Sequence, residues 1–403
     1  MKKEFLKFYL INFIFEIART IPHAFVTIYL LSSGITIFQI SVMQIIYMLS
    51  IILFEIPSGV ISDHLSRKKL YFVACILMVL SYLLYIKVYS FVFIAIAQLL
   101  YGISSALQTG TIDALILNSV KDHGNEEKQK DVIGDFVRNS EIIMTIAMIV
   151  GSYIGTYLFH TYLKSKVYII SIVLFVISGI LALFMKEDKA KQTSSKDIWK
   201  DFRKNCYQHL KQGLEIFLKN KKLLIIVSIS ASLQFILQPF FNYWQPISVM
   251  KGMNETSLNI VYILMQLATI VGAFLFSKIN SGKKRRNDGL VFMGILLVST
   301  LATSLVASNK YLFITLLLVS ILPRTLISIE VNSEIHNKIE NSFRSTMTSI
   351  SSLYQRLFSV VILFIMGVIS KFGVNLVKIF LICCGVYIIT YIPLVIANKK
   401  RSS

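Results

Sequence analysis

Long apolar runs, separated by short polar breaks, follow one another along nearly the whole chain. About 20 apolar residues in a helix cross the hydrocarbon core of a bilayer, because each residue adds about 1.5 Å to a thickness of roughly 30 Å. The pattern predicts a polytopic, all-α membrane protein with twelve membrane-spanning helices. They cover residues 5–31, 37–62, 69–88, 91–120, 136–162, 166–186, 223–250, 256–277, 289–307, 310–333, 345–370 and 372–397.

The composition agrees with this pattern, since 55% of the 403 residues are hydrophobic and 15% are charged. The first apolar run follows Lys2 and Lys3, as the core of a signal peptide does. However, Glu16 and Arg19 interrupt this run, and no small-residue cleavage site follows it. We therefore expect the segment to be retained as the first span.

The net charge of +20 is distributed unevenly between the predicted connections. The termini and the even-numbered connections hold about thirty of the lysines and arginines, which by the positive-inside rule makes both termini cytoplasmic. The odd-numbered connections and adjacent helix ends hold only Lys87, Lys164, Lys166, Lys251, Lys310, Lys371 and Lys378. We expect a multi-pass protein of a cell membrane, namely the bacterial plasma membrane. Its basic cytoplasmic face should meet anionic lipids and not nucleic acid.

The longest polar interruption divides the chain into two sets of six spans. We predict an N-terminal bundle over residues 1–186, a cytoplasmic linker over 187–222 and a C-terminal bundle over 223–403. Apolar residues recur at helical intervals in the linker, which favours an amphipathic helix on the membrane surface, although a solvated linker explains at least 187–196. The basic clusters "SRKK" and "SGKKRR" follow the second and eighth spans, an internal repeat typical of secondary transporters.

The connection after the second span carries a recognisable motif. Its sequence, Gly59-Val-Ile-Ser-Asp63-His-Leu-Ser-Arg67-Lys68-Lys69, resembles the signature G-x-x-x-D-R-x-G-R-R/K of the major facilitator superfamily. The segments Glu55–Gly59 and Gly110–Val120 look like a bacterial drug-efflux branch of that family. The resemblance implies two six-helix bundles that rock around a central substrate site.

Several positions depart from the family's patterns. His64 and Ser66 stand where the signature has arginine and glycine. Gln98 replaces the arginine of the R-x-x-x-G pattern that ends at Gly102, and the Gly151-Ser-Tyr-Ile-Gly155 segment lacks the proline found in many antiporters. The departures weaken the antiporter assignment but not the superfamily assignment.

In the family, the loop between the second and third spans latches the two halves together in the outward-facing state. Asp63 could accept hydrogen bonds from the start of span eleven, near Arg344, because a helix N-terminus favours an anion. A simple positive-inside stop would explain the basic residues but not Asp63. The candidate latch residues are Gly59, Asp63, Arg67, Lys68, Asp113, Arg138, Glu141 and Arg344.

Charged residues inside the predicted spans indicate a functional site, because an ionised group at the bilayer centre costs about 2.5–3.5 kcal/mol. Glu16 and Arg19 lie three residues apart on one face of span one and can pair directly. Two interpretations remain open: a permanent ion pair that orients the helix, or a proton carrier at Glu16. The candidates for proton coupling are Glu16, Arg19, Glu55 and Glu330.

Other polar residues on these spans are candidates for a substrate cavity. Gln238 and Asn242 flank Pro239 in an aromatic part of span seven. His23 follows Arg19 on the polar face of span one and either relays protons or packs through hydrogen bonds. The full set of cavity candidates is Asn12, His23, Gln98, Gln238, Asn242, Arg324 and Arg356.

We therefore expect a secondary transporter that exports a hydrophobic or amphipathic small molecule in exchange for protons. Proton-coupled import of a small metabolite is the alternative, and a lipid translocase or a sensor could use the same scaffold. No motif of a metalloprotease, a serine hydrolase or a P-loop is present, so we expect no enzyme. We expect no metal and no cofactor, a proton gradient as the energy source, and a monomer.

Overall fold

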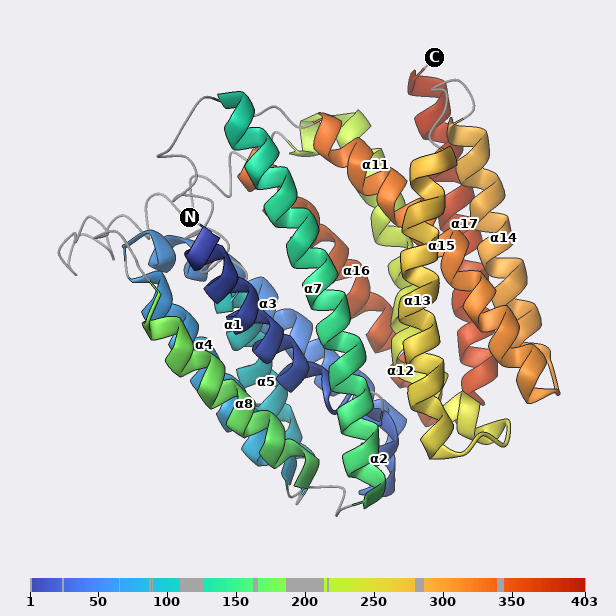
Figure 1. Cartoon of the computed structure of the whole chain (residues 1–403). Helices are drawn as coiled ribbons and strands as arrows, with labels where there is room; N and C mark the ends of the chain where they lie inside the picture. Colours follow the sequence, from blue (N-terminus) through green and yellow to red (C-terminus); the bar gives the residue numbers. More distant parts are fainter. Residues whose placement is uncertain are drawn as a thin grey trace. The chain divides into compact units, whose positions relative to one another are not determined.

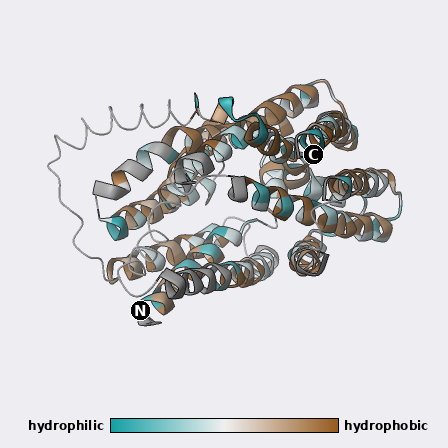
Figure 2. Ribbon diagram, turned by 90° about the horizontal axis from the view of Figure 1, so that it is seen from above, coloured by the Kyte–Doolittle hydropathy of each residue, from teal (hydrophilic) through white to brown (hydrophobic). Residues whose placement is uncertain are grey.

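The structure is a computed structural model of the chain, and its described part is helical apart from short turns and connections. It describes residues 2–23, 25–64, 66–86, 88, 90–108, 126–161, 166–185, 214–215, 217–279, 286–338 and 344–402. Within these residues, ten helices are long and apolar enough to cross a membrane, and Val167–Leu183 adds a shorter apolar helix. Figure 2 shows hydrophobic residues along the helices, with hydrophilic residues in shorter patches.

The helices follow the predicted spans in order (Figure 1). In the first half they are α1 (Lys2–Thr20), α2 (Val26–Ser32), α3 (Ile37–His64), α4 (Arg67–Ile86), α5 (Phe91–Gln108), α7 (Glu126–Thr161) and α8 (Lys166–Leu183). In the second half they are α11 (Lys221–Ser232), α12 (Gln234–Met250), α13 (Glu255–Ile279), α14 (Arg286–Val306), α15 (Lys310–Lys338), α16 (Arg344–Lys371) and α17 (Leu376–Ser402).

The chain forms two compact units, of which the first contains Met1–Ile35 and Ile46–Tyr207. In it, α4 packs along both α8 and α5, while α1 packs on α7 and α8 (Figure 1). Buried serines tie these helices together, because a hydroxyl on one helix donates to a main-chain carbonyl on another. Ser104 of α5 donates to Ala74 of α4 over 2.7 Å, and Ser178 of α8 donates to Ile11 of α1 over 3.0 Å. Such bonds contribute to helix association in a membrane, where apolar contact alone provides little driving force.

The first predicted span is broken into α1 and α2, which is a correction to the single helix expected over 5–31. Pro22 comes two residues after the end of α1 and has no N–H to continue the helical hydrogen bonds. Two glycines of α7 lie against this break. A Cβ on Gly151 would lie 2.8 Å from the carbonyl oxygen of Ile17, and a Cβ on Gly155 would overlap the carbonyl oxygen of Ile21. The glycines therefore allow α7 to touch the backbone of α1.

The second unit contains Thr36–Ile45 and Gln208–Ser403. Here α14 packs on α15 and α17, α13 packs on α15, and α11 and α12 pack on α16 and α17. The start of α3 also packs within this unit: the Lys371 ammonium lies 3.7 Å from the centre of the Phe38 ring. A Cβ on Gly367 of α16 would lie 3.1 Å from the Cβ of Ser41.

The seventh predicted span is also two helices, because the turn at Leu233 is tightened. The N–H of Leu233 donates to the carbonyl of Ser230, three residues back, instead of four. Pro239 and Pro246 both lie inside α12. The end of the predicted linker enters this unit, since Phe217 is buried and its ring lies 5.6 Å from that of Tyr354 on α16. The residues of the linker up to 213 lie outside the described part.

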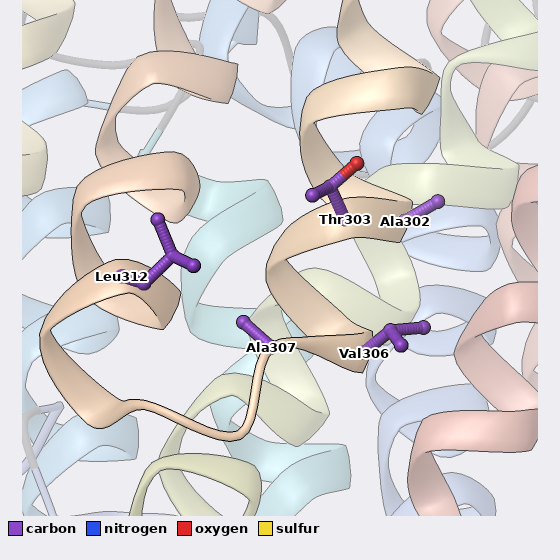
Figure 3. A pocket seen from close by; sticks show the side chains of 5 residues that line it. All are labelled: Ala302, Thr303, Val306, Ala307 and Leu312. Carbon is purple, nitrogen blue, oxygen red and sulfur yellow. The ribbon is translucent and has the colours of Figure 1, made fainter.

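A shallow apolar groove of about 430 Å³ lies where α14 ends and α15 begins (Figure 3). The side chains that line it come from Ala302, Thr303, Val306, Ala307 and Leu312. Its lining carries one hydroxyl and no charge, so it resembles a lipid-facing surface more than a polar solute site.

Gly155→Ala is expected to destabilise the first unit. The added methyl group would collide with the backbone of Ile21, and overpacking of this kind costs about 1–3 kcal/mol. The matched control is Gly385→Ala on α17, where a Cβ meets nothing within 4 Å. Thermal unfolding in detergent should show a lower midpoint for Gly155→Ala than for the control; equal midpoints would contradict the close contact between α7 and α1.

Candidate functional site

A buried ion pair on α1 is the centre of the candidate site. The Arg19 Nη2 atom lies 2.6 Å from the Glu16 Oε2 atom, three residues earlier on the same helix. The two side chains differ in access: 3% of Glu16 is exposed, against 24% of Arg19. The structure thus brings together the two residues that the sequence pattern predicted to pair.

Tyrosines from three other helices surround this pair. Tyr47 of α3 and Tyr101 of α5 are stacked with ring centres 5.1 Å apart, and both interact electrostatically with Arg19. Tyr82 of α4 donates its hydroxyl hydrogen to the main-chain carbonyl of Arg19 over 3.0 Å. The ion pair therefore lies beside a flat aromatic surface that can also hydrogen-bond.

The tyrosine cluster continues into the core of the first unit. Tyr85 stacks on Tyr168 with ring centres 5.3 Å apart, and Tyr29 donates to the main-chain carbonyl of Tyr85 over 2.9 Å. Gln98, a predicted cavity residue, is buried and donates its amide hydrogen to the Tyr85 hydroxyl over 2.6 Å. Sequence reasoning missed these tyrosines; the only signal was that several recur at three- or four-residue spacing beside the polar residues of α4 and α5.

The other predicted residues of the first unit lie on the same helices. Asn12 is buried one turn before Glu16. His23 is half-buried in the turn between α1 and α2 and interacts electrostatically with Arg19. Glu55 is half-buried on α3, and its main-chain carbonyl accepts a hydrogen bond from Ser58. Of Asn12, His23 and Glu55, His23 is the residue that we connect to the ion pair, through its electrostatic interaction with Arg19.

In the second unit, a network of amides and hydroxyls links α12 to α16. Gln238 donates its side-chain amide to Gln234 and Ser359 over 3.1 and 3.2 Å. Ser359 in turn donates to the Gln234 carbonyl oxygen over 2.9 Å. Asn242 is buried and donates to the main-chain carbonyl of Gln238 over 2.8 Å. The two predicted cavity amides are therefore held by neighbouring groups.

The same network reaches α11. Ser230 donates to the Gln355 side chain over 2.9 Å, and Ser228 shares a hydrogen bond of 3.1 Å with Tyr354. Sequence reasoning did not select Ser228, Ser230 or Tyr354, because single hydroxyls are common in membrane helices. The network lies at the break between α11 and α12.

The remaining charged candidates of the second unit are half-buried. The Arg324 guanidinium on α15 lies 5.5 Å from the ring centre of Phe241, a cation–π contact. Glu330 lies two turns further along the same helix, and Arg356 lies one residue after Gln355 on α16. Arg324 therefore lies beside the aromatic part of α12, while Arg356 is placed only by its position on α16.

The predicted latch is described only in part. The Lys68 ammonium donates to the main-chain carbonyl of Met185, just beyond the end of α8, over 3.3 Å. Arg67 is half-buried and Glu141 is exposed. The side chains of Gly59, Asp63, Arg138 and Arg344, and the whole of Asp113, lie outside the described part. Lys68 thus anchors the end of α8, a contact that sequence reasoning did not predict.

Polar contacts also link the C-terminal helix to its neighbours. Asn398 of α17 donates to the buried Glu334 of α15 over 3.5 Å, and Lys399 pairs with Asp288 of α14.

In the part of the chain that the structure describes, no group of three His, Cys, Asp or Glu side chains could hold a metal ion.

The sequence matches the family model of the major facilitator superfamily over residues 8–362. The chain belongs to this superfamily. The match covers the ion pair, the motif after the second span and the amide network, and it confirms the superfamily that the resemblance of the Gly59–Lys69 segment predicted. It does not address the drug-efflux branch, which stays a prediction.

One curated relative is similar to the chain in sequence, and two solved structures are similar to it in fold. An uncharacterised MFS-type transporter, YxaM of Bacillus subtilis (strain 168), is 20% identical over 244 residues, which are 60% of this chain and 58% of the relative. The nucleoside transporter NupG matches with a TM-score of 0.77 at 13% identity, over 98% of this chain and 99% of that one. A D-xylose-proton symporter matches with a TM-score of 0.73 at 11% identity, over 98% and 96%. The predicted all-α fold of twelve spans in two six-helix bundles is confirmed.

Lys68→Gln is expected to loosen the end of α8. A hydrogen bond from a charged donor to a helix C-terminal carbonyl would be lost, which costs roughly 0.5–1.5 kcal/mol at a half-buried position. The matched control is Lys69→Gln, because Lys69 is exposed. Hydrogen exchange of the amides at the end of α8 should become faster in Lys68→Gln alone; an equal change in both variants would show that only the charge of the loop matters.

Proposed function

We propose that this protein is a secondary transporter that couples the movement of a small solute to the movement of protons, with Glu16 as the proton carrier. The proposal is supported by membership of the major facilitator superfamily. The observation that carries it is the ion pair of Glu16 and Arg19 on α1, within the first span that the sequence predicts, with tyrosines beside it. The protein needs no cofactor in this scheme, works as a monomer and draws on the proton gradient.

The ion pair gives the protein two states that differ in charge. With Glu16 ionised, its carboxylate neutralises Arg19, and the pair costs less to bury than either charge alone. With Glu16 protonated, the Arg19 guanidinium loses its anionic partner and must find another acceptor. A proton taken up at Glu16 therefore changes what the site binds best, which is the requirement for coupling.

The proposed solute is a small amphipathic molecule. The stacked Tyr47 and Tyr101 rings offer an apolar, planar surface, while Arg19 offers a charged hydrogen-bond donor beside it. The sequence predicts export by exchange with protons. Import by symport uses the same groups and is the second candidate, favoured by the fold likeness to a protein named a D-xylose-proton symporter.

Glu16→Gln is expected to abolish transport driven by a pH gradient, because glutamine has the shape of protonated glutamate but cannot exchange a proton. Native protein and variant are reconstituted in vesicles, and flux of ethidium, uridine, D-xylose and benzoate is followed with and without the gradient. Glu215→Gln is the control, since Glu215 is exposed and far from the pair in sequence. Gradient-driven flux of any of these probes that persists in Glu16→Gln would transfer the coupling to Glu55 or Glu330.

The same vesicles distinguish the remaining functions on this scaffold. A sensor would move none of the probes in the native protein, and a lipid translocase would instead move a headgroup-labelled lipid between leaflets. Either result in the native protein would overturn the proposed transport of a small solute.

We also propose that the loop after α3 acts as a latch that limits the rate of the transport cycle. Asp63→Asn removes the charge that would hold a helix N-terminus in the latched state. Transport should slow severalfold while binding of the solute, measured by thermal stabilisation, is unchanged. Asp288→Asn serves as the control, because Asp288 is exposed and pairs with Lys399. Full-rate transport by Asp63→Asn would reject the latch.

A further inference from the structure

The two members of the ion pair are not equally accessible. Glu16 is nearly completely enclosed, whereas about a quarter of the Arg19 side chain is exposed. The neighbouring Tyr47 and Tyr101 are also half-buried, so the accessible part of the site is a cation beside two aromatic rings. A solute that enters this site meets the guanidinium and not the carboxylate.

Arg19 has hydrogen-bond donors to spare. A guanidinium carries five N–H donors, and Glu16 lies against Nη2. The Arg19 Nε atom is buried and has no hydrogen-bond partner among the described residues. Tyr82 contacts only the main-chain carbonyl of Arg19, so it uses none of these donors. Because a carboxylate can accept two parallel bonds from a guanidinium, the free edge of Arg19 fits a planar anion.

Among the described residues, the other groups that interact with the pair supply no competing anion at neutral pH. These groups are His23 in the turn after α1, Tyr47 on α3, Tyr82 on α4 and Tyr101 on α5. Further out, Tyr85 on α4 interacts with Tyr82 and Tyr101, and Tyr168 on α8 interacts with Tyr82. All are neutral or potentially cationic side chains, so Glu16 is the one carboxylate in this set.

We propose that the solute is a small aromatic carboxylate that takes the place of Glu16 as the partner of Arg19. This inference rests on the proposed function and names the class of its substrate. The ring lies on Tyr47 and Tyr101, and the carboxylate binds the guanidinium. Glu16 takes up a proton from the aqueous side as it loses its partner, so one proton and one anion enter the site together.

The exchange keeps the net charge of the site constant. Before binding, the Glu16 carboxylate balances Arg19; after binding, the solute carboxylate balances Arg19 and Glu16 is neutral. The site therefore carries no added charge when it is occupied. Moving an added charge through the low-dielectric membrane would be costly. Proton and solute then travel in the same direction, which favours symport over exchange for this site.

The test compares three probes of similar shape: benzoate, benzamide and benzylammonium. Binding to the full chain in detergent is measured by titration calorimetry at several pH values at which benzoate stays ionised. Benzoate should bind more tightly than the other two. Its affinity should rise as the pH falls, by up to about tenfold per pH unit, because binding takes up one proton.

Variants of the pair sharpen the test. Glu16→Gln should bind benzoate at least as tightly as the native protein does at low pH, and without pH dependence. Arg19→Gln should lose benzoate binding. Arg19→Lys keeps the charge and should retain part of the binding, which would show that the loss in Arg19→Gln is not caused by misfolding. The inference is overturned by benzoate binding no tighter than benzamide, by benzylammonium binding that requires Glu16, or by pH dependence that survives Glu16→Gln.

The outcomes separate this inference from the proposed function. If Glu16→Gln abolishes gradient-driven transport but benzoate does not bind, the coupling stands and the substrate class is wrong. If benzoate binds through Arg19 while Glu16→Gln still shows gradient-driven transport, the anion site stands and the coupling role of Glu16 is wrong.

Discussion

A carboxylate and a guanidinium held 2.6 Å apart on α1, in the first predicted span, are the constraint on which the rest of the first unit depends. Either charge alone would be costly to bury in the membrane, and the pair offsets only part of that cost. What makes the position tolerable is the surrounding set of hydroxyls and polarisable rings on α3, α4 and α5. These groups stabilise a charge without adding one, and in the proposed mechanism the protonation of Glu16 responds to what binds Arg19.

The helices around the pair are adapted to a first span that is broken into α1 and α2. Because α1 ends near Pro22, the last main-chain carbonyls of α1 have no helical N–H partner. They need other hydrogen-bond donors, which an unbroken helix would not require. Gly151 and Gly155 on α7 provide the close approach at Ile17 and Ile21. The break leaves the Arg19 carbonyl free to accept the hydrogen bond from Tyr82, and His23, which interacts electrostatically with Arg19, lies in the turn that follows. A kink and a small-residue surface thus serve the electrostatics of the site.

Much of this could be read from the sequence, since it depends on local spacing. Apolar runs gave the spans, and the three-residue spacing of Glu16 and Arg19 predicted their contact. The breaks at Pro22 and Leu233 were missed, because hydropathy averages over a window and does not register one missing or shifted hydrogen bond. Lys68 was assigned to the latch because of its motif, but its partner is a main-chain carbonyl, which has no signature in a sequence. The tyrosine cluster joins residues from five helices, and only the fold brings them together.

The two units solve the problem of polar groups in a membrane in different ways. The first places an ion pair beside tyrosines, and in the proposed mechanism the interactions of this pair change with the uptake of one proton. The network linking α11, α12 and α16 in the second consists of amides and hydroxyls, such as Gln238 bound to both Gln234 and Ser359. Amides and serine hydroxyls do not titrate near neutral pH, and these already satisfy one another. A change in pH near neutrality therefore leaves this network of amides and hydroxyls unaltered.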